Sequence, residues 1–478
     1  MAFEGKKIIL SFMKCTKFFF LLMIAGLFFF SCKKDSFINS ADARLSFSAD
    51  TLKFDTVFVT AGSVSRVVKI INNNNQKLRI SSIKLSGGAA SPFRINVNGT
   101  ASPEVNNVEL AANDSMYVFV TVFINPGLNP LPFIISDSIS VSYNGNTRFI
   151  QLQAYGQNAV FLNNKTISTN TTWNNSLPYV ILGGIKIASG ATLTIEAGTK
   201  IYAHANAAFI VDGTMLANGT FSNKITFKSD RLDEPYKFFP AGWPGIFFRD
   251  SSKNNIITYA EILNAFQAIV VLNPSQNSNP KLILKQTLID NAFNAGIICS
   301  NTKLVAENCL ISNCSSNIVL QLGGDYNFIH CTSAVYSTRF ISHSFPALSV
   351  SDYALVNGNV QTASLVAVFR NSIFWGDNGN VDNEVQVTKE GNTVSITFDH
   401  CLYKAAGIIP FSTFIAPIKN QDPLFDSIDY SNNIYDFRIS KNPSSPAVNK
   451  GINTTLLKDL DNNNRNVGLP DLGCYEKQ

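Results

Sequence analysis

A six-residue sequence pattern occurs three times in the middle of this chain, and it strongly limits the possible folds. The copies occupy residues 259–264, 286–291 and 308–313, which start 27 and 22 residues apart. Each copy places a small residue, an isoleucine and an asparagine at alternate positions, which share one face of a strand. A second apolar run follows each copy, at 269–271, 297–299 and 318–320. Two short strands per repeat, joined by a bend at the asparagine, predict stacked coils of a parallel β-helix.

The same pattern extends in both directions along the chain. Related segments occur downstream at 330–331, 371–374 and 400–403. Short apolar segments separated by glycines occur upstream at 185–187, 193–195 and 209–211. We therefore expect a β-helical domain over residues 158–478, with its first strand near residue 160. About a dozen coils at ~4.8 Å spacing would make a rod ~60 Å long.

Residues 44–157 follow a different pattern, which predicts a β-sandwich. Seven stretches alternate apolar and polar residues, and turns rich in Asn, Gly and Asp separate them. They span residues 52–59, 64–71, 78–85, 93–97, 116–124, 133–143 and 147–154. Short strands with turns and no helical stretch are typical of sandwiches. We expect a linker at 156–164.

The first 31 residues predict a secretion signal. Lys14 and Lys17 precede an apolar run from residue 18 to 30. A helix of that length reaches only ~20 Å, which is short of the ~30 Å hydrocarbon core of a bilayer. A signal peptide therefore explains the run better than a membrane span does. Met13 is an alternative start to Met1, because residues before it add little to such a signal.

Cys32 follows Ser31 directly after that run, which resembles a bacterial lipobox. The resemblance implies that Cys32 carries lipid and that residues 32–43 form a tether. The charged residues after Cys32 look like those of exported lipoproteins of the Bacteroidota. The implied location is the cell envelope, at the outer membrane or cell surface. A plain cleaved signal peptide is the alternative.

The positions of the remaining cysteines in the repeat predict buried free thiols rather than disulfide bonds. Cys309, Cys331 and Cys401 fall at the small inward position of the repeat, and Cys299 aligns with apolar residues of neighbouring coils. A buried cysteine acts there as a small hydrophobe. No histidine stands beside these cysteines at ligand spacing, so the pattern does not favour a zinc site. Cys314 and Cys474 have no assignment from the pattern.

Two groups of segments resemble known protein families. Residues 114–126 and 67–73 are similar to immunoglobulin-like domains of the abnormal-spindle and hydin type, which are often spacers or adhesive modules. Residues 193–201, 225–227 and 242–246 look like the opening coils of right-handed β-helix surface proteins. The expected fold is therefore all-β, with an N-terminal immunoglobulin-like sandwich followed by a right-handed parallel β-helix.

The end of the chain resembles the closing signature of the choice-of-anchor Q proteins. That resemblance lies in residues 459–465 and 471–476, with 445–451 before them; Cys474 departs from the pattern, where alanine is commoner. The rod as a whole resembles the pectin-lyase-like superfamily, which includes lyases, hydrolases and non-catalytic adhesins. The resemblance is therefore specific for architecture and not for activity.

The repeats do not show a pair of catalytic carboxylates. Hydrolysis of a glycosidic bond needs two acids close together. The coils instead offer isolated acids, namely Glu261, Asp290, Glu307 and Asp399. A lyase needs a base beside an acidic sugar and a cation to neutralise its carboxylate. Nothing in the sequence brings the candidate cations Lys285, Arg370 and Lys389 together.

A metal cofactor is not expected either. Asp459, Asp461 and Asn463 alternate as in a calcium loop, but Asn464 stands where such a loop needs glycine. We expect a turn there, in which an aspartate pairs with Arg465 and helps to close the rod. The four histidines are too scattered in the sequence to suggest a metal site.

Two excursions from the rod offer the best recognition residues. The first spans residues 229–244, and its candidate ligand-binding residues are Arg231, Tyr236, Phe239 and Trp243. The second spans residues 338–362 and contains Phe340, His343, Phe345 and Tyr353. Aromatic faces with nearby charges suit sugar binding. Packing of the loops onto the scaffold is the alternative.

Composition excludes one further class of partner. The net charge is +5, and +3 of it belongs to the predicted signal peptide, so no basic surface argues for nucleic acid. Five Asp-Ser or Asp-Thr pairs, at Asp50, Asp55, Asp114, Asp137 and Asp426, resemble glycosylation acceptors of the Bacteroidota and equally fit ordinary turns. The leading hypothesis is a lipoprotein that binds a glycan or surface partner without catalysis. The alternatives are a polysaccharide lyase or hydrolase and a structural spacer.

Overall fold

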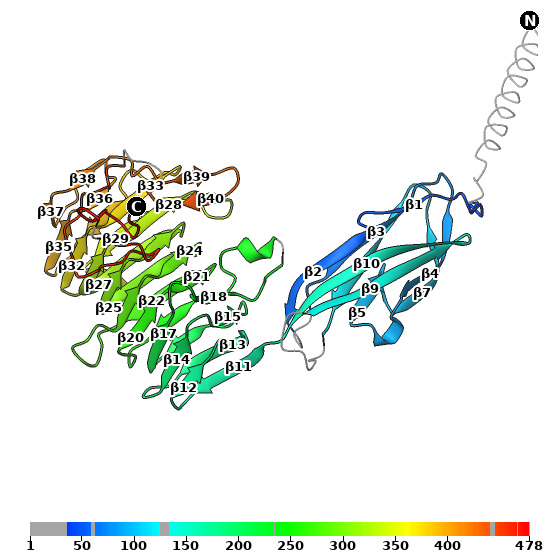
Figure 1. Ribbon diagram of the computed structural model, residues 1–478, viewed down its shortest axis with the longest axis horizontal. Coiled ribbons are helices and arrows are strands. Elements are labelled where there is room, and N and C mark those ends of the chain that lie inside the picture. The colour runs from blue at the N-terminus through cyan, green and yellow to red at the C-terminus, as the bar shows by residue number, and fades with distance from the viewer. Residues whose placement is uncertain are drawn as a thin grey trace, which may run out of the picture. The chain divides into compact units, whose positions relative to one another are not determined.

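The computed structural model describes residues 36–58, 63–124, 133–233, 235–439, 445–465 and 467–477. The predicted signal peptide and Cys32 lie outside the described residues. The chain forms two compact units, of which the second contains the chain from Gly156 onward (Figure 1). The described residues form 40 β-strands and two 3₁₀ turns, η1 (Gly88–Ala90) and η2 (Tyr236–Phe238). The prediction of an all-β chain is confirmed.

The first unit is built from two five-stranded sheets. One sheet has the order β1 (Leu45–Phe47), β3 (Arg66–Asn72), β8 (Ser115–Val122), β5 (Phe93–Val97) and β6 (Thr100–Ala101). The other has the order β2 (Thr51–Phe58), β10 (Asn146–Gln157), β9 (Phe133–Tyr143), β4 (Leu78–Leu85) and β7 (Glu104–Leu110).

Alternate residues of both sheets form the core of this unit. Val68 and Ile70 of β3 and Val118 and Val120 of β8 are fully buried. The rings of Phe54 and Phe93, from different sheets, lie 5.8 Å apart, so the two sheets pack face to face. All seven predicted strands are present, whereas the short strands β1 and β6 and the polar strand β7 were missed. The predicted linker is wrong, because β10 runs to Gln157 and β11 begins at Val160.

The second unit is built on one 26-stranded sheet that winds through successive coils. Each strand pairs in parallel with the equivalent strand of the next coil, as in a parallel β-helix. A complete coil has three strands rather than the two predicted, and it therefore presents three outer faces.

The first face contains ten strand segments: β12 (Thr171–Trp173), β14 (Thr192–Glu196), β17 (Thr214–Asn218), β20 (Asn255–Thr258), β23 (Leu282–Lys285), the second halves of β25 (Ala295–Glu307) and β27 (Ser316–Ile329), β32 (Leu365–Arg370), β35 (Val394–Asp399) and β37 (Ser412–Ile415).

The second face contains the first halves of β11 (Val160–Ile167) and β13 (Tyr179–Ile187), β15 (Lys200–Ala203), β18 (Ile225–Ser229), β21 (Ala260–Leu263), β24 (Leu288–Asp290), β26 (Leu310–Ser312), β28 (Thr332–Tyr336), β33 (Ile373–Asp377), β36 (Leu402–Tyr403) and β38 (Ile418–Lys419).

The third face contains the second halves of β11 and β13, β16 (Phe209–Val211), β19 (Ile246–Phe248), β22 (Gln267–Leu272), the first halves of β25 and β27, β29 (Leu348–Ser351) and β34 (Val385–Thr388). The second face stacks eleven strands, which agrees with the prediction of about a dozen coils.

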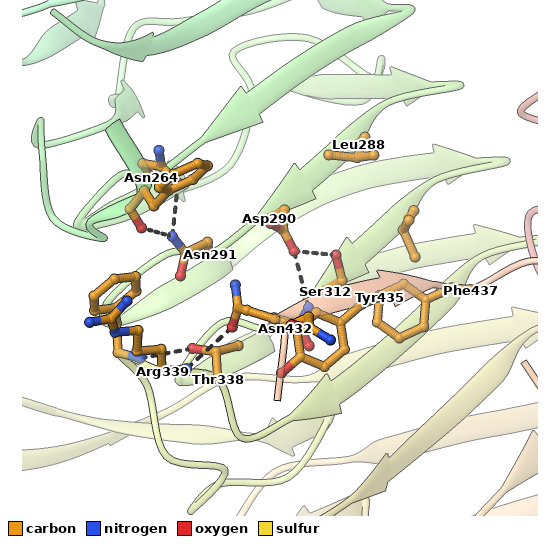
Figure 2. A pocket seen from close by; sticks show the side chains of 15 residues that line it. Asn264, Leu288, Asp290, Asn291, Ser312, Thr338, Arg339, Asn432, Tyr435 and Phe437 are labelled. Atoms are coloured by element: carbon orange, nitrogen blue, oxygen red, sulfur yellow. Dashed lines mark hydrogen bonds between the residues drawn. The ribbon is translucent and has the colours of Figure 1, made fainter. Parts of the chain in front are cut away.

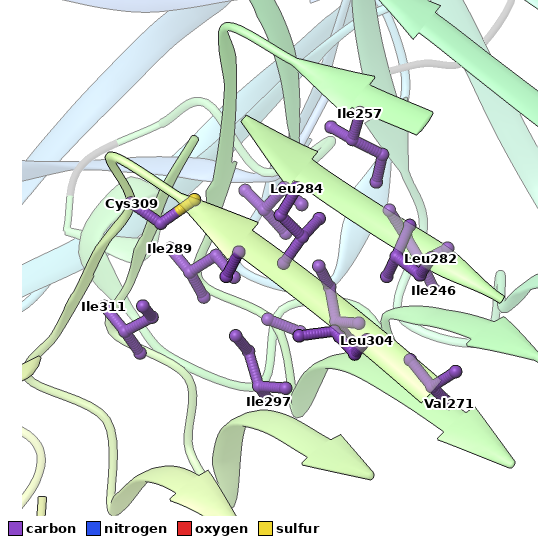
Figure 3. Close-up of a cluster of buried hydrophobic side chains, with 14 of the residues drawn as sticks. Ile246, Ile257, Val271, Leu282, Leu284, Ile289, Ile297, Leu304, Cys309 and Ile311 are labelled. Carbon is purple, nitrogen blue, oxygen red and sulfur yellow. The ribbon is translucent and has the colours of Figure 1, made fainter. Parts of the chain in front are cut away.

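The interior of the coils is a continuous apolar core (Figure 3). The register of the second face places one small residue from each of six successive coils in a single buried column. Its members are Ala260, Thr287, Cys309, Cys331, Ser372 and Cys401, each no more than 1% exposed. Cys299 pairs in register with Val271 and Leu320, and all six described cysteines are buried and free. The prediction that Cys299, Cys309, Cys331 and Cys401 pack as small hydrophobes is confirmed.

Residues with positive φ make two of the corners. Asn264, Asn291 and Asn313 have φ of 60°, 58° and 49°, and they separate the second face from the third. The predicted bend at these asparagines is confirmed. Their predicted place on the inward face of a strand is wrong, because each is the corner residue itself. Asparagine suits this left-handed conformation because its short polar side chain bonds locally.

The C-terminal segment, described over residues 445–465 and 467–477, lies against another corner. Asn308 Nδ2 donates to Lys458 O at 2.8 Å, and Asn371 Nδ2 donates to Ile452 O at 2.7 Å. Arg465 is fully buried and pairs with Glu476 at 3.1 Å, so its predicted aspartate partner is wrong. Asp461 pairs instead with Arg438, and Asp459 accepts the backbone N–H groups of Asn463 and Glu476.

Candidate ligand-binding site

The four residues predicted for ligand binding in the first excursion have different environments. Trp243 is 1% exposed and belongs to the coil core, where its Nε1 donates to Leu263 O at 2.9 Å. The prediction that Trp243 contacts a surface ligand is therefore wrong. Arg231 pairs with Asp233 at 2.8 Å and lies over the ring of Tyr236 at 3.9 Å, so one edge and one face of its guanidinium are occupied.

The two predicted excursions meet at an aromatic contact. The rings of Phe239 and Phe340 lie 4.8 Å apart. Phe239 in turn packs on Tyr236 at 5.2 Å, and the neighbouring Phe238 is 51% exposed. Tyr353 of the second excursion lies elsewhere, in the hairpin of β30 (Tyr353–Val356) and β31 (Asn359–Thr362).

A cavity of about 460 Å³ lies over the second face beside this contact (Figure 2). Its floor consists of outward residues of two adjacent strands, β24 and β26. The walls come from both excursions, from the corner asparagines and from the hairpin of β39 (Ser427–Asp429) and β40 (Ile434–Asp436), which lies beside β28 and β33 (Figure 1). The lining residues are Phe238, Asn264, Leu288, Asp290, Asn291, Leu310, Ser312, Asn313, Thr338, Arg339, Phe340, Asn432, Asn433, Tyr435 and Phe437.

Strand alternation explains why the floor carries these side chains. Ile289 and Ile311 point into the core and are fully buried. Their neighbours Leu288, Asp290, Leu310 and Ser312 must then point outward. On an uncovered coil these side chains would face water, but here they face the cavity.

Asp290 is the titratable group of the floor. Its Oδ1 accepts a hydrogen bond from Ser312 Oγ at 2.7 Å and a long contact from Asn313 Nδ2 at 3.5 Å (Figure 2). Oδ2 makes no hydrogen bond to any described residue. Burial raises the pKa of Asp290 to about 6, although the bonds from Ser312 and Asn313 oppose the shift. The carboxyl therefore changes charge close to neutral pH.

The corner asparagines fasten the first excursion to the coil. Asn291 Nδ2 donates to Phe238 O at 2.9 Å and to Asn264 Oδ1 at 2.8 Å. Asn264 Nδ2 donates to Lys237 O at 2.8 Å. The recurring asparagine of the repeat therefore has a second role here, which is to position one wall of the cavity.

The β39–β40 hairpin is fastened to the second excursion. Tyr435 OH donates to Ser337 O at 2.9 Å, and the Arg339 backbone N–H donates to Asn433 Oδ1 at 3.2 Å. The rings of Tyr336 and Phe437 stack at 5.9 Å below this wall. Burial raises the pKa of Tyr435, so its hydroxyl keeps its proton at neutral pH.

The other isolated acids of the sequence lie in ion pairs on the coil surface. Glu261 pairs with Lys224 at 3.1 Å and Glu307 with Lys285 at 3.3 Å. Asp399 pairs with Arg370 at 2.9 Å and with His400 at 2.7 Å. Asp290 is the single carboxyl among the described residues that line the cavity.

The histidines do not converge on one site. His204 pairs with Asp230 at 2.8 Å, and His343 pairs with Glu384 at 3.2 Å beneath the second excursion. Burial holds the pKa of His330 well below its usual range. Across the described parts of the chain, no group of three or more His, Cys, Asp or Glu residues is arranged to hold a metal ion.

Sequence reasoning placed Phe340 in a recognition loop but missed most of the cavity. Asp290 was noted only as an isolated acid, and Arg339, Asn433 and Tyr435 were not singled out. The three come from segments far from β24 in the sequence. No local pattern marks them, because their proximity arises only when the excursion and the hairpin fold back over the second face.

The chain matches no protein-family model and no curated protein. Solved structures similar to parts of it include a family 123 glycoside hydrolase from Clostridium perfringens, with 13% identity, a TM-score of 0.18 and coverage of 27% of this chain and 30% of that one. The ASH / PapD-like domain of human CEP192 matches with 10% identity, a TM-score of 0.18 and coverage of 26% and 91%. A protein of unknown function from Porphyromonas gingivalis W83 matches with 9% identity, a TM-score of 0.18 and coverage of 26% and 59%. Similarities at this level carry no argument about fold or function.

Proposed function

We propose that the protein binds a glycan, without cleaving it, in the cavity over β24 and β26. Aromatic rings at the wall suit the apolar faces of sugar rings, and the carboxyl and amides suit their hydroxyl groups. Asp290 Oδ2 is available to such a hydroxyl, since it bonds to no described residue. The proposed ligand is a polysaccharide or a glycan on a surface partner.

The observation that carries this proposal is the single carboxyl of the cavity. Glycoside hydrolysis uses two carboxyl groups, ~5–10 Å apart, as acid and as base or nucleophile. Among the described lining residues only Asp290 can fill either role. Binding therefore fits the cavity better than hydrolysis does.

Binding can be tested by titrating the purified protein with a panel of neutral and acidic oligosaccharides. We expect at least one ligand to bind, and D290A to weaken it roughly 10-fold or more, because a hydrogen bond to a charged group contributes ~1.5–3 kcal/mol. The matched control is D325N, which removes an exposed carboxylate on the first face and should leave binding unchanged. Equal affinity of D290A and the wild type would contradict the assignment of the cavity.

A polysaccharide lyase is the second candidate, because Asp290 and Arg339 line the same cavity. A carboxyl with a pKa of about 6 can serve as a base near neutral pH, and a guanidinium can neutralise an acidic sugar. A lyase would release unsaturated products, and D290N would abolish them. Detection of that activity would replace binding by catalysis, whereas failure to retain any glycan would favour a structural spacer.

We further propose that the mature chain is anchored by lipid at Cys32 to the cell envelope, at the outer membrane or cell surface. The leader before Cys32 supports this proposal. Within the residues that the structure describes, no helix is long and apolar enough to cross a membrane. Fatty-acid labelling of the full chain should mark the wild type and not C32S. Equal labelling would contradict the anchor.

The finer family assignment is part of the same proposal. We assign the first unit to the immunoglobulin-like sandwiches and the second to right-handed β-helices with a choice-of-anchor Q type ending. Two packed antiparallel sheets support the first assignment. The strong general preference of parallel crossovers for the right hand supports the second.

A further inference from the structure

We infer that the cavity selects a glycan residue that carries a negative charge, and that Arg339 recognises this charge. The charged group is a carboxylate or a sulfate ester. This inference rests on the proposed glycan-binding function, and it names the chemical class of the ligand.

The pairing of the arginines in the second unit carries the inference. Five of its six arginines contact a carboxylate within the chain. Their pairs are Arg231–Asp233, Arg249–Asp212, Arg370–Asp399, Arg438–Asp461 and Arg465–Glu476, at 2.5 to 3.1 Å. Arg339 is the exception: it has no carboxylate partner among the described residues, and it lines the cavity. Among the described residues, the one arginine of the second unit without a counter-charge is thus the one that lines the cavity.

The chain around Arg339 is fixed, which favours recognition over a freely moving surface charge. Its backbone N–H donates to Asn433 Oδ1, and Thr338 Oγ1 accepts the N–H groups of Phe340 and Ile341 at 3.2 and 3.1 Å. The guanidinium carbon lies 5.8 Å from the Phe340 ring centre. A guanidinium presents several donors in a planar fork that matches a carboxylate or a sulfate.

Asp290 and Arg339 occupy separate sides of the cavity. Asp290 comes from β24 and Arg339 from the second excursion, and no ion pair joins the two side chains. A sugar residue can therefore lie between them, with its charged group toward Arg339 and a hydroxyl toward Asp290. Asn433 Nδ2, which bonds to no described residue, is a further donor on the Arg339 side.

The test compares oligosaccharides that differ only in charge. One pair is a uronic-acid oligosaccharide and its carboxyl-reduced form, and the other is a sulfated oligosaccharide and its desulfated form. The wild type should bind the charged member of at least one pair roughly 10-fold more tightly, with a preference that weakens as salt is added. The pair that shows the preference identifies the charged group.

Variants then assign the preference to Arg339. R339Q should bind both members of the pair with the affinity that the wild type has for the neutral member, and R339K should restore part of the preference. K303Q is the matched control, since it removes one positive charge from an ion pair on the first face. It should keep the full preference.

Two results would overturn the inference and leave glycan binding intact. They are equal binding of the charged and neutral members by the wild type, and an undiminished preference in R339Q. Failure of the wild type to bind any member, charged or neutral, would overturn the proposed function as well.

Discussion

The first and second faces of the same coils are built in different ways. On the first face, outward residues of adjacent strands form the surface ion pairs Lys285–Glu307, in which Glu307 is half-buried, and Lys303–Asp325. On the second face, the next strands of these coils carry Leu288, Asp290, Leu310 and Ser312, and the excursions and the hairpin cover them. The scaffold beneath the two faces is shared, so the difference lies in the covering segments.

This difference shows that the segments added to the scaffold, which are the two excursions and the hairpin, cover the second face. Solvated charges keep the first face soluble and contribute little to stability. On the second face, the excursions and the hairpin bury the carboxyl of Asp290. This burial raises the pKa of Asp290 at a cost in stability. A costly arrangement of this kind is typical of functional sites.

The largest expected effect comes from the interior that both faces share. I311A removes a fully buried side chain between β24 and β28, and it should lower the free energy of unfolding by about 2–5 kcal/mol. Equilibrium urea unfolding followed by circular dichroism measures this change. V366A, an outward residue on the first face that is 47% exposed, is the control and should change stability by less than ~0.5 kcal/mol. Equal losses in both variants would show that the inward residues of the second face do not form the core.

The next effect concerns pH. The pKa of Asp290 is about 6 in the folded protein and near 3.8 in the unfolded chain, so the carboxyl binds its proton more tightly when the protein is folded. The free energy of unfolding of the wild type should therefore fall between pH 4 and 6, and D290N should lack this contribution. D290N should gain roughly 2–3 kcal/mol relative to the wild type over that range.

D325N controls for the loss of a negative charge in that experiment. The measurement is urea unfolding at pH 4, 5, 6 and 7 for all three proteins. Parallel curves for D290N and the wild type would mean that the excursions and the hairpin do not shield Asp290 from solvent.

A smaller effect is expected at the hydrogen bond that holds the β39–β40 hairpin against the second excursion. Y435F removes the hydrogen bond from Tyr435 OH to Ser337 O but keeps the ring, and should cost ~1 kcal/mol. Hydrogen exchange in the hairpin, residues 427–436, should become faster, while exchange in β23 should stay the same. Unchanged exchange in the hairpin would show that this bond does not hold the wall.

The smallest effect belongs to the first face. K285A breaks an exposed ion pair and should lower stability by no more than ~1 kcal/mol. Glycan affinity should not change. A clear loss of affinity in K285A would contradict the assignment of binding to the second face.

The sequence predicted the interior well, because inward residues recur at the period of a strand and stack coil on coil. It missed the first-face strands beside the repeat, because a single corner residue such as Tyr259 separates β20 from β21. The prediction took that residue as the start of one strand.

The cavity could be predicted only in part. The aromatic composition of the excursions marked them for recognition, but it did not separate Trp243, which packs inward, from Phe238, which is exposed. Asp290 and Tyr435 become neighbours through the path of the chain after the last coil. Neither periodicity nor composition encodes that path.

Hydrogen–deuterium exchange with and without a retained oligosaccharide tests the central claim most directly. The account predicts slower exchange on binding in residues 310–313, 337–341 and 432–437, with no change in residues 303–307 of the first face. Protection of the first face, with none around Asp290 and Arg339, would contradict it.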